Sequence, residues 1–216
     1  MIVDERLVTY INSLDRGSTK LLDEIEREAK DACVPIIRKE MQQFLKWLLT
    51  LKKPKKILEI GTAVGFSALF MAEYTPVPCE IDTIENYEKR IPIAEENFKR
   101  AGRDEITLYK GNAQDILPTI KTNYDLIFMD GAKGQYISFL PEVVRLLKPG
   151  GVLVSDNVLQ EGDIIESRFA VTRRNRTIHK RMRDYLYELT HHQELVTAVL
   201  PVGDGITVST KRESAV

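Results

Sequence analysis

From residue 55 onward, short apolar runs rich in β-branched residues alternate with stretches of helical periodicity, and this alternation constrains the fold most strongly. The runs predict strands at residues 56–60, 81–84, 106–109, 126–129 and 152–154. Helices are expected at residues 67–74, 87–101 and 136–147, the last one stopped by the KPGG of residues 148–151. Because strands that alternate with helices pair in parallel through right-handed crossovers, the sequence predicts an α/β sheet.

Both ends of the chain depart from this pattern. Residues 36–51 predict a helix with Ile37, Met41, Phe44, Leu48 and Leu51 at helical spacing. A second helix is expected over residues 172–189, with Ile178, Met182, Tyr185 and Leu189 on its buried stripe. Residues 194–200 and 206–210 then predict two strands, which their short link forces to run antiparallel. We therefore expect one domain over residues 1–216, with a helical cap (1–52) and a Rossmann-like core (53–216) whose seven-stranded, mostly parallel sheet ends in an antiparallel hairpin.

Composition narrows the class of protein further. The chain has 216 residues, of which 43 % are hydrophobic and 29 % are charged, which excludes a disordered chain and a small disulfide scaffold. No apolar run approaches the roughly 20 residues that span a bilayer, and the charged first fifteen residues lack a secretory pattern, so we expect a cytoplasmic protein without a membrane segment. Cys33 and Cys79 have no metal-ligand spacing and are interpreted as packing residues.

Charge is balanced in total but unevenly distributed. The 31 basic and 32 acidic residues give a net charge of −1. Residues 167–183 contain no acidic residue, and their basic residues are Arg168, Arg173, Arg174, Arg176, Lys180, Arg181 and Arg183. This run predicts a cationic face that suits an RNA backbone. The alternative is a solvated face that pairs with the protein's own acids or with a second copy. His179, His191 and His192 are interpreted as surface residues.

A glycine loop follows the first predicted strand, in the sequence ILEIGTAVGFS of residues 57–67. Gly61 and Gly65 let the backbone turn tightly and approach a ligand at the carboxyl edge of the sheet. The spacing is not GxGxxG, and Glu59 would repel a phosphate but suits a cofactor with positive charge. Taken alone, the glycines are equally compatible with a simple strand-to-helix turn.

Polar residues follow the second and third predicted strands. Glu85 stands 24 residues after Gly61 (85 − 61), where a carboxylate can accept both hydroxyl protons of a ribose, although a solvated strand-end acid is the alternative. Ala113 and Gln114 lie in the loop of residues 111–115, which is small and polar enough to contact an adenine edge. Together with the glycine loop, these residues predict an S-adenosylmethionine site.

Carboxylate and amide side chains follow the fourth and fifth predicted strands. If these strands are neighbours, Asp130, Asp156 and Asn157 converge, and three oxygen ligands with two negative charges suit Mg²⁺ or Mn²⁺. The alternative is a helix cap at Asp130 and a turn at Asp156. Lys133 follows closely and is placed to take the proton of a hydroxyl on a chelated substrate, unless it is a solvated surface lysine.

In combination, these motifs resemble the cation-dependent O-methyltransferases, the family of catechol and caffeoyl-CoA O-methyltransferases. The resemblance covers nearly the full chain and rests on residues 58–61, Glu85, residues 129–133 and residues 155–157. It implies a class I methyltransferase fold, a homodimer, and cofactor contacts by Ile37, Glu59, Gly61, Ser67, Glu85, Ala113, Gln114 and Asp130. It also implies that Asp130, Asp156 and Asn157 hold the metal and that Lys133 is the general base, with Asp130 as the second catalytic residue.

The sequence is especially similar to the bacterial branch of this family that methylates 5-hydroxyuridine in tRNA to 5-methoxyuridine. The 5-hydroxyl and 4-carbonyl oxygens of that base sit on adjacent ring carbons and imitate a catechol. The resemblance therefore implies a tRNA anticodon arm, held by Arg173, Arg174, Arg176, Lys180, Arg181 and Arg183. The first alternative is a small catechol-like or caffeoyl-type phenol. A NAD-dependent oxidoreductase or a non-catalytic nucleotide-binding module is a remote one, against which Glu59 and the three oxygen ligands argue.

Overall fold

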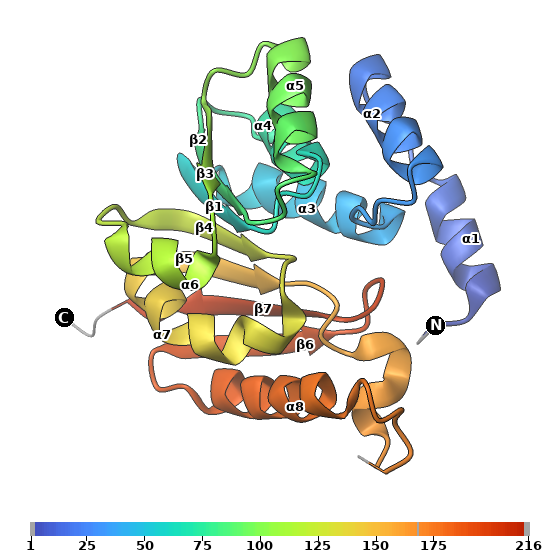
Figure 1. Cartoon of the computed structure of the whole chain (residues 1–216), viewed down its shortest axis with the longest axis vertical. Helices are drawn as coiled ribbons and strands as arrows, with labels where there is room; N and C mark the ends of the chain where they lie inside the picture. The colour runs from blue at the N-terminus through green and yellow to red at the C-terminus, as the bar shows by residue number, and fades with distance from the viewer. Residues whose placement is uncertain (1–2, 168, 214–216) are drawn as a thin grey trace.

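A seven-stranded sheet runs through the centre of the molecule, with helices packed on both faces (Figure 1). The computed structural model describes residues 3–167 and 169–213. The strands are β1 (Lys56–Ile60), β2 (Glu80–Glu85), β3 (Ile106–Lys110), β4 (Tyr124–Met129), β5 (Leu147–Ser155), β6 (Leu195–Leu200) and β7 (Ile206–Lys211). Their order is β3-β2-β1-β4-β5-β7-β6, in which only the pairs β5·β7 and β6·β7 are antiparallel. The predicted fold, a mostly parallel sheet that ends in an antiparallel hairpin, is confirmed.

Helices precede and connect the strands. The α-helices are α1 (Glu5–Ser13), α2 (Lys20–Asp31), α3 (Lys39–Lys52), α4 (Phe66–Tyr74), α5 (Ile91–Ala101), α6 (Ala113–Ile116), α7 (Tyr136–Leu146) and α8 (Arg176–His191). Three shorter 3₁₀ segments are η1 (Leu117–Thr119), η2 (Lys133–Gln135) and η3 (Gln160–Ile165). None of the helices in the described part of the chain has both the length and the apolar character that a membrane crossing requires.

Alternating side chains on the strands build a core on each face of the sheet. On β1, Ile57 packs against residues of α2 to α5, whereas Leu58 packs against residues of α7 and α8. On β4, Phe128 and Ile127 divide in the same way. Because these central strands bury both faces, they read as continuous apolar runs, which is why the sequence located them.

Helix α3 belongs to the core of the α2-to-α5 face. It buries Met41, Leu45, Leu48 and Leu49 together with Ile57 of β1. Leu51, which the helical spacing assigned to the same stripe, is 61 % exposed. The prediction was wrong there because Leu51 lies to one side of the helix face that Met41, Leu45 and Leu49 bury, so its side chain faces solvent. The N-terminal α1 buries no residue.

Several predicted boundaries were wrong for local reasons. The helix expected from residue 36 begins at Lys39, because the chain before it is extended at Arg38. The helix expected from residue 87 begins at Ile91, with a proline in its first turn. The strand expected at residues 152–154 begins earlier, at Leu147, which pairs with Tyr124 before a register shift. The KPGG of residues 148–151 follows the end of α7 as expected but lies within β5. Cys33 is exposed rather than packed, and Cys79 is partly buried.

The anchoring of α3 in the core can be tested by truncating one buried and one exposed leucine of the same helix. Leu49 is fully buried, so Leu49→Ala should lower the free energy of unfolding by about 2–5 kcal/mol. Leu51→Ala should change it by no more than about 0.5 kcal/mol. Urea denaturation monitored by circular dichroism measures both, and equal losses in the two variants would contradict this assignment of the core.

Candidate active site

A cavity of about 900 Å³ lies at the carboxyl ends of the parallel strands. The register of the sheet places these ends side by side: Ile60 pairs with both Ile84 and Met129, and Met129 pairs with Ser155. The residues that follow these partners therefore meet at one edge of the sheet. They are Gly61, Glu85, Asp130 and Asp156, and all four line the cavity.

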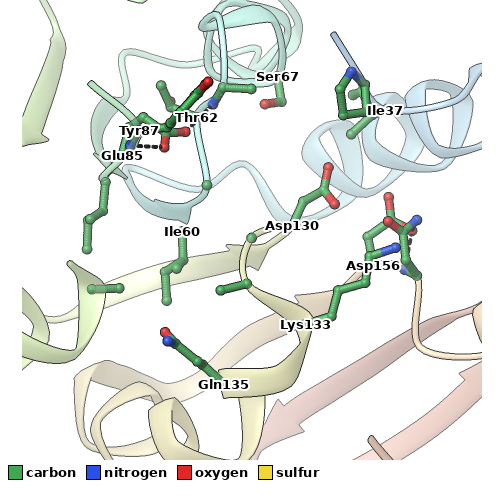
Figure 2. A pocket seen from close by; sticks show the side chains of 18 of the residues that line it. Ile37, Ile60, Thr62, Ser67, Glu85, Tyr87, Asp130, Lys133, Gln135 and Asp156 are labelled. Carbon is green, nitrogen blue, oxygen red and sulfur yellow. Dashed lines mark hydrogen bonds between the residues drawn. The ribbon is translucent and has the colours of Figure 1, made fainter. Parts of the chain in front are cut away.

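One end of the cavity, here called the carboxylate end, is formed by Asp130, Lys133, Asp156 and Asn157. Figure 2 shows the side chains of Asp130, Lys133 and Asp156 turned toward one another. The backbone N–H and the Nδ2 of Asn157 both donate to Oδ1 of Asp156, at 2.6 and 3.1 Å. Asn157 adopts a left-handed backbone conformation with φ of 58°, which turns the chain away from β5 directly after the carboxylate.

The two carboxylates are in electrostatic conflict. Burial raises the pKa of Asp130 well above its usual range, and the charge of Asp156 raises it further, while Lys133 opposes both effects. Burial likewise raises the pKa of Asp156 to about 6, with a contribution from Asp204, against the opposing backbone N–H of Asn157 and the charge of Lys133. The carboxylate end therefore holds more negative charge than its own cations neutralise.

This donor set fits a hard divalent cation. Two carboxylates and one amide supply only oxygen ligands, which Mg²⁺ and Mn²⁺ prefer. No hydrogen bond contributes to the pKa of the Asp130 carboxylate, whose oxygens are thus left for another partner. Within the described residues no group of three His, Cys, Asp or Glu side chains could hold a metal. The side-chain amide of Asn157, next to Asp156, adds an oxygen donor to the two carboxylates.

Tyr136 holds the ends of β4 and β5 at a fixed separation. Its buried hydroxyl lies 3.0 Å from the carbonyl oxygen of Met129 and 3.3 Å from that of Asp156. Its ring packs edge-on against Tyr185, whose hydroxyl lies 2.6 Å from Oγ of Ser155. Because these contacts involve the backbone on both sides, they keep Asp130 and Asp156 at one spacing without occupying their carboxylates.

The opposite end of the cavity, here called the glycine-loop end, contains Gly61, Ser67, Glu85 and Ala113. The carboxylate of Glu85 accepts the backbone N–H groups of Ala63 at 2.7 Å, Asn86 at 2.9 Å and Tyr87 at 2.8 Å. A carboxylate offers about four acceptor positions, so Glu85 is held rigidly and still has room for a donor from a ligand. Ile37 lines the wall of the cavity, as Figure 2 shows.

Gly61 is required where β1 approaches the loop after β4. Its φ is +103°, and an added Cβ would lie 2.7 Å from both the carbonyl oxygen of Asp130 and the Cα of Gly131. Both of these atoms belong to the backbone, so a side chain at position 61 has to push the two loops apart. The close approach thus links the glycine-loop end to the carboxylate end.

Glu59 and Gln114, both predicted to bind the cofactor, do not line the cavity. Glu59 is fully buried, and the hydroxyls of Thr62, Ser67 and Thr83 donate to its carboxylate. Burial raises the pKa of Glu59, while these three hydrogen bonds oppose the shift. Glu59 therefore stabilises the glycine loop from its buried side through these hydrogen bonds. The backbone N–H of Gln114 donates to Asn112 in the cap of α6, and its side chain lies outside the cavity wall.

The structure also places residues in the cavity wall that the sequence did not single out. Arg38, Tyr87, Arg90 and Asp204 all line the cavity. Arg38 forms an ion pair with Glu161 at 2.8 Å, which joins the segment before α3 to η3. Tyr87 lies two residues after Glu85 at the carboxyl end of β2, so its position could have been inferred from the sequence. Asp204 lies in the PVGDG link of residues 201–205, whereas Arg38 and Arg90 belong to no recognisable motif.

Six of the predicted cationic residues lie on α8 and in the loop that leads into it, two segments that also contribute to the cavity wall. We call them the basic surface, and they are Arg173, Arg174, Arg176, Lys180, Arg181 and Arg183. None of the six lines the cavity, but Asn175 and Ile178 between them do. In the part of the chain that the structure describes, none of the six forms an ion pair with a carboxylate. Arg168, the seventh predicted cation, lies outside the described residues.

Helix α8 corrects two predictions about its faces. His179 is 2 % exposed, so the prediction of a surface residue was wrong, and neither ring nitrogen has a hydrogen-bond partner among the described residues. Ile178, predicted to lie on the buried stripe, is 37 % exposed at the cavity. Residues three and four apart share a helix face, so periodicity alone fits either position to Met182. The helix also begins at Arg176 rather than at residue 172, which leaves Arg173 and Arg174 in the preceding loop.

Comparison with known proteins gives a consistent family. Residues 12–212 match the family model described as O-methyltransferase. The chain is 33 % identical to the caffeoyl-CoA O-methyltransferase of Medicago sativa over 181 residues, which cover 77 % of this chain and 70 % of that protein. It is 34 % identical to the catechol O-methyltransferase of Niastella koreensis over 129 residues, which cover 57 % of this chain and only 58 % of that protein.

The solved structures agree. An SAH-bound methyltransferase of Podospora anserina superposes with a TM-score of 0.87 at 27 % sequence identity, over 97 % of this chain and 95 % of that one.

The close approach at Gly61 can be tested with a matched pair of glycine variants. Gly61→Ala should weaken S-adenosylmethionine binding by at least about tenfold, because the new Cβ meets backbone atoms and separates the loops. Gly102 also has a positive φ, but nothing lies near an added Cβ, so Gly102→Ala should lower stability without changing the affinity. Isothermal titration calorimetry measures both, and unchanged affinity in Gly61→Ala would contradict the requirement.

The electrostatic conflict predicts a pH dependence of stability in EDTA. The pKa of Asp156, about 6 in the folded chain, exceeds the unfolded value near 3.9, so its stabilising contribution is complete below about pH 4 and disappears as the pH rises through 6. The melting temperature should therefore fall between about pH 4 and 6.5, and less steeply in Asp156→Asn. Asp184→Asn, at an exposed acid of α8, should keep the wild-type slope. If the melting temperatures of the wild type and Asp156→Asn changed with pH in parallel, the electrostatic conflict at Asp156 would be refuted.

Proposed function

The chain belongs to the O-methyltransferase family, and from this premise we propose that it methylates a hydroxyl whose neighbouring carbon carries a second oxygen, with a divalent cation as cofactor. Membership makes the protein an S-adenosylmethionine-dependent O-methyltransferase, which sets the oxidoreductase and non-catalytic alternatives aside. The observation that carries the finer proposal is the carboxylate end. There, Asp130, Asp156 and Asn157 present oxygen donors beside Lys133, in the same cavity as the glycine-loop end.

The residues of the cavity have separate tasks in this proposal. When bound, a divalent cation supplies Lewis acidity and S-adenosylmethionine supplies an electrophilic methyl group. Asp130, Asp156 and Asn157 would hold the cation and orient the two oxygens of the acceptor. Lys133 would take the hydroxyl proton at Nζ. Glu85, Gly61 and Ser67 would hold the methyl donor, so that the chain contributes mainly by aligning the two reactants.

The names of the relatives support a small acceptor. Both the catechol and the caffeoyl-CoA O-methyltransferases are named for substrates with two adjacent ring oxygens. The chain covers 70 % of the Medicago sativa enzyme and 58 % of the Niastella koreensis enzyme, so their substrates are candidates here. A catechol-like or caffeoyl-type phenol is therefore one proposed acceptor.

The basic surface favours a second acceptor, 5-hydroxyuridine in tRNA. Six cationic side chains without carboxylate partners among the described residues lie on segments that contribute to the cavity wall, and a free catechol could enter the cavity without their help. An RNA backbone uses such a surface. An unstacked base of an anticodon arm could enter the cavity, where its 5-hydroxyl and 4-carbonyl oxygens would satisfy the same two-oxygen requirement. We test this acceptor alongside the phenols, whereas the homodimer implied by the family resemblance stays a prediction.

Methyl transfer from labelled S-adenosylmethionine to three acceptors tests the proposal. The acceptors are catechol, caffeoyl-CoA and an anticodon-arm hairpin that contains 5-hydroxyuridine. Removing the cation with EDTA, or a metal ligand with Asp156→Ala, should lower transfer to every active acceptor by at least about a hundredfold. Undiminished transfer in EDTA would overturn the cation-dependent mechanism.

The double variant Arg173→Gln with Arg174→Gln separates the two acceptor classes. If RNA is the acceptor, this variant should raise KM for the hairpin and reduce the salt slope of binding by up to about 2, while any transfer to catechol stays unchanged. Lys20→Gln with Lys30→Gln, two exposed lysines on α2, serves as the charge-matched control. An inert hairpin with efficient transfer to catechol or caffeoyl-CoA would refute the RNA acceptor and leave the phenol.

A further inference from the structure

Residues 164–167 and 169–174, which lead from the end of η3 to the start of α8, carry the two most exposed large apolar side chains of the described residues. Ile165, the last residue of η3, and Phe169 are each 82 % exposed, whereas the other exposed apolar side chains in those residues reach at most 63 %. A phenylalanine ring in water loses the hydrophobic stabilisation that burial would provide. That stabilisation becomes available when a ligand covers the ring.

This segment is fastened to the cavity wall at both of its ends. Asp163 before it and Asn175 after it both line the cavity. Ile164 and Val171 are buried and hold it against the body of the molecule. In Figure 1 it projects at the end of α8 where that helix begins. Phe169 thus stands on a segment whose two ends are anchored at the cavity wall.

Arg176 supports the ring of Phe169. The Cζ atom of its guanidinium lies 5.8 Å from the centroid of the ring, within the range of a cation–π contact. Nε donates to the carbonyl oxygen of Val171 at 3.3 Å, and Nη2 donates to that of Phe169 at 3.4 Å. These hydrogen bonds orient the guanidinium while most of the ring stays open to solvent.

The surroundings of the ring identify the class of ligand. Arg173 and Arg174 follow it in the chain, and both are exposed without a carboxylate partner among the described residues. An open aromatic ring among unpaired cations fits a planar base on an anionic backbone, because single-stranded RNA is bound by stacking on aromatic rings and by contacts to its phosphates. The attachment of the segment to the cavity wall favours RNA over a lipid surface, since a base that enters the cavity brings its neighbours to this segment.

We propose that Phe169 is a stacking platform for an unpaired nucleobase that flanks the base to be methylated, with Arg176 as its support. The inference rests on the RNA acceptor of the proposed function and adds a second base-binding site outside the cavity. Phe169 is a positioning residue in this role, because it contacts a neighbour of the reacting base rather than the reacting base itself.

Binding of the 5-hydroxyuridine hairpin to three variants tests the platform. Phe169→Ala should weaken binding by roughly 5- to 150-fold, the loss expected for one base–aromatic stack, and Phe169→Tyr should restore it. Tyr187→Ala is the matched control, because Tyr187 is also an exposed aromatic residue, 62 % accessible, on the far part of α8. Fluorescence anisotropy gives the affinities, and equal losses in Phe169→Ala and Tyr187→Ala would overturn the proposal.

A change in the RNA provides a second readout. With 2-aminopurine beside the 5-hydroxyuridine, stacking on Phe169 should quench its fluorescence in the wild type and in Phe169→Tyr but not in Phe169→Ala. Two further hairpins each carry an abasic site at one of the two positions that flank the 5-hydroxyuridine. One of these abasic sites should lower the affinity of the wild type to that of Phe169→Ala for the intact hairpin. The same abasic site should not lower the affinity of Phe169→Ala any further. If Phe169→Ala still lowered the affinity by the full factor on both abasic hairpins, the stacking platform would be overturned.

The two levels of the proposal fail in different ways. A wild type that methylates the hairpin, with Phe169→Ala unchanged in affinity, would overturn the platform and leave the RNA acceptor. A wild type that neither binds nor methylates the hairpin would overturn both. Binding of anionic phosphatidylserine vesicles that Phe169→Ala abolishes, or a change in oligomeric state by sedimentation, would assign the ring to a membrane or to a subunit contact and would likewise overturn the platform.

Discussion

The parallel register of the central strands is the constraint on which the cavity depends. Because Ile60, Met129 and Ser155 are aligned across β1, β4 and β5, the residues that follow them meet at one edge of the sheet. A slip of one residue in β5 would carry Asp156 to the other face of the sheet and separate it from Asp130. Tyr136 secures the alignment with contacts to the backbone of both strands, so the spacing of the carboxylates is set by the fold rather than by the carboxylates themselves.

The fold uses its carboxylates in two opposite ways. Glu85 and Glu59 are held by internal hydrogen bonds, one by backbone N–H groups and the other by hydroxyls, and both fix the shape of the glycine loop. Asp130 and Asp156 are buried next to each other, and their raised pKa values show that the folded chain disfavours their charges. A stable scaffold thus buries one pair of carboxylates whose negative charges its own cations do not neutralise.

Sequence periodicity predicted the parts of the molecule that follow from local pattern. Strands buried on both faces and polar residues at their carboxyl ends are visible in the chain, so the pattern alone was enough to place Asp130, Asp156, Glu85 and Gly61 at one edge of the sheet. Which way Glu59 points depends on the hydroxyls that long-range packing brings to it, and the positions of Arg38 and Asp204 depend on segments outside the parallel sheet. The faces of α8 were misassigned because Ile178 and His179 fit the same stripe.

The ion pair between Arg38 and Glu161 has a consequence for the stability of the cavity wall. The pair joins segments 123 residues apart in the chain, yet both side chains are substantially solvated, at 42 % and 62 % accessible. An ion pair of this kind contributes at most about 1 kcal/mol, less than twice the thermal energy RT. Both side chains line the cavity, so this part of its wall is joined by a contact weak enough to break thermally, and a molecule with its own charges can replace the pair with little loss of affinity.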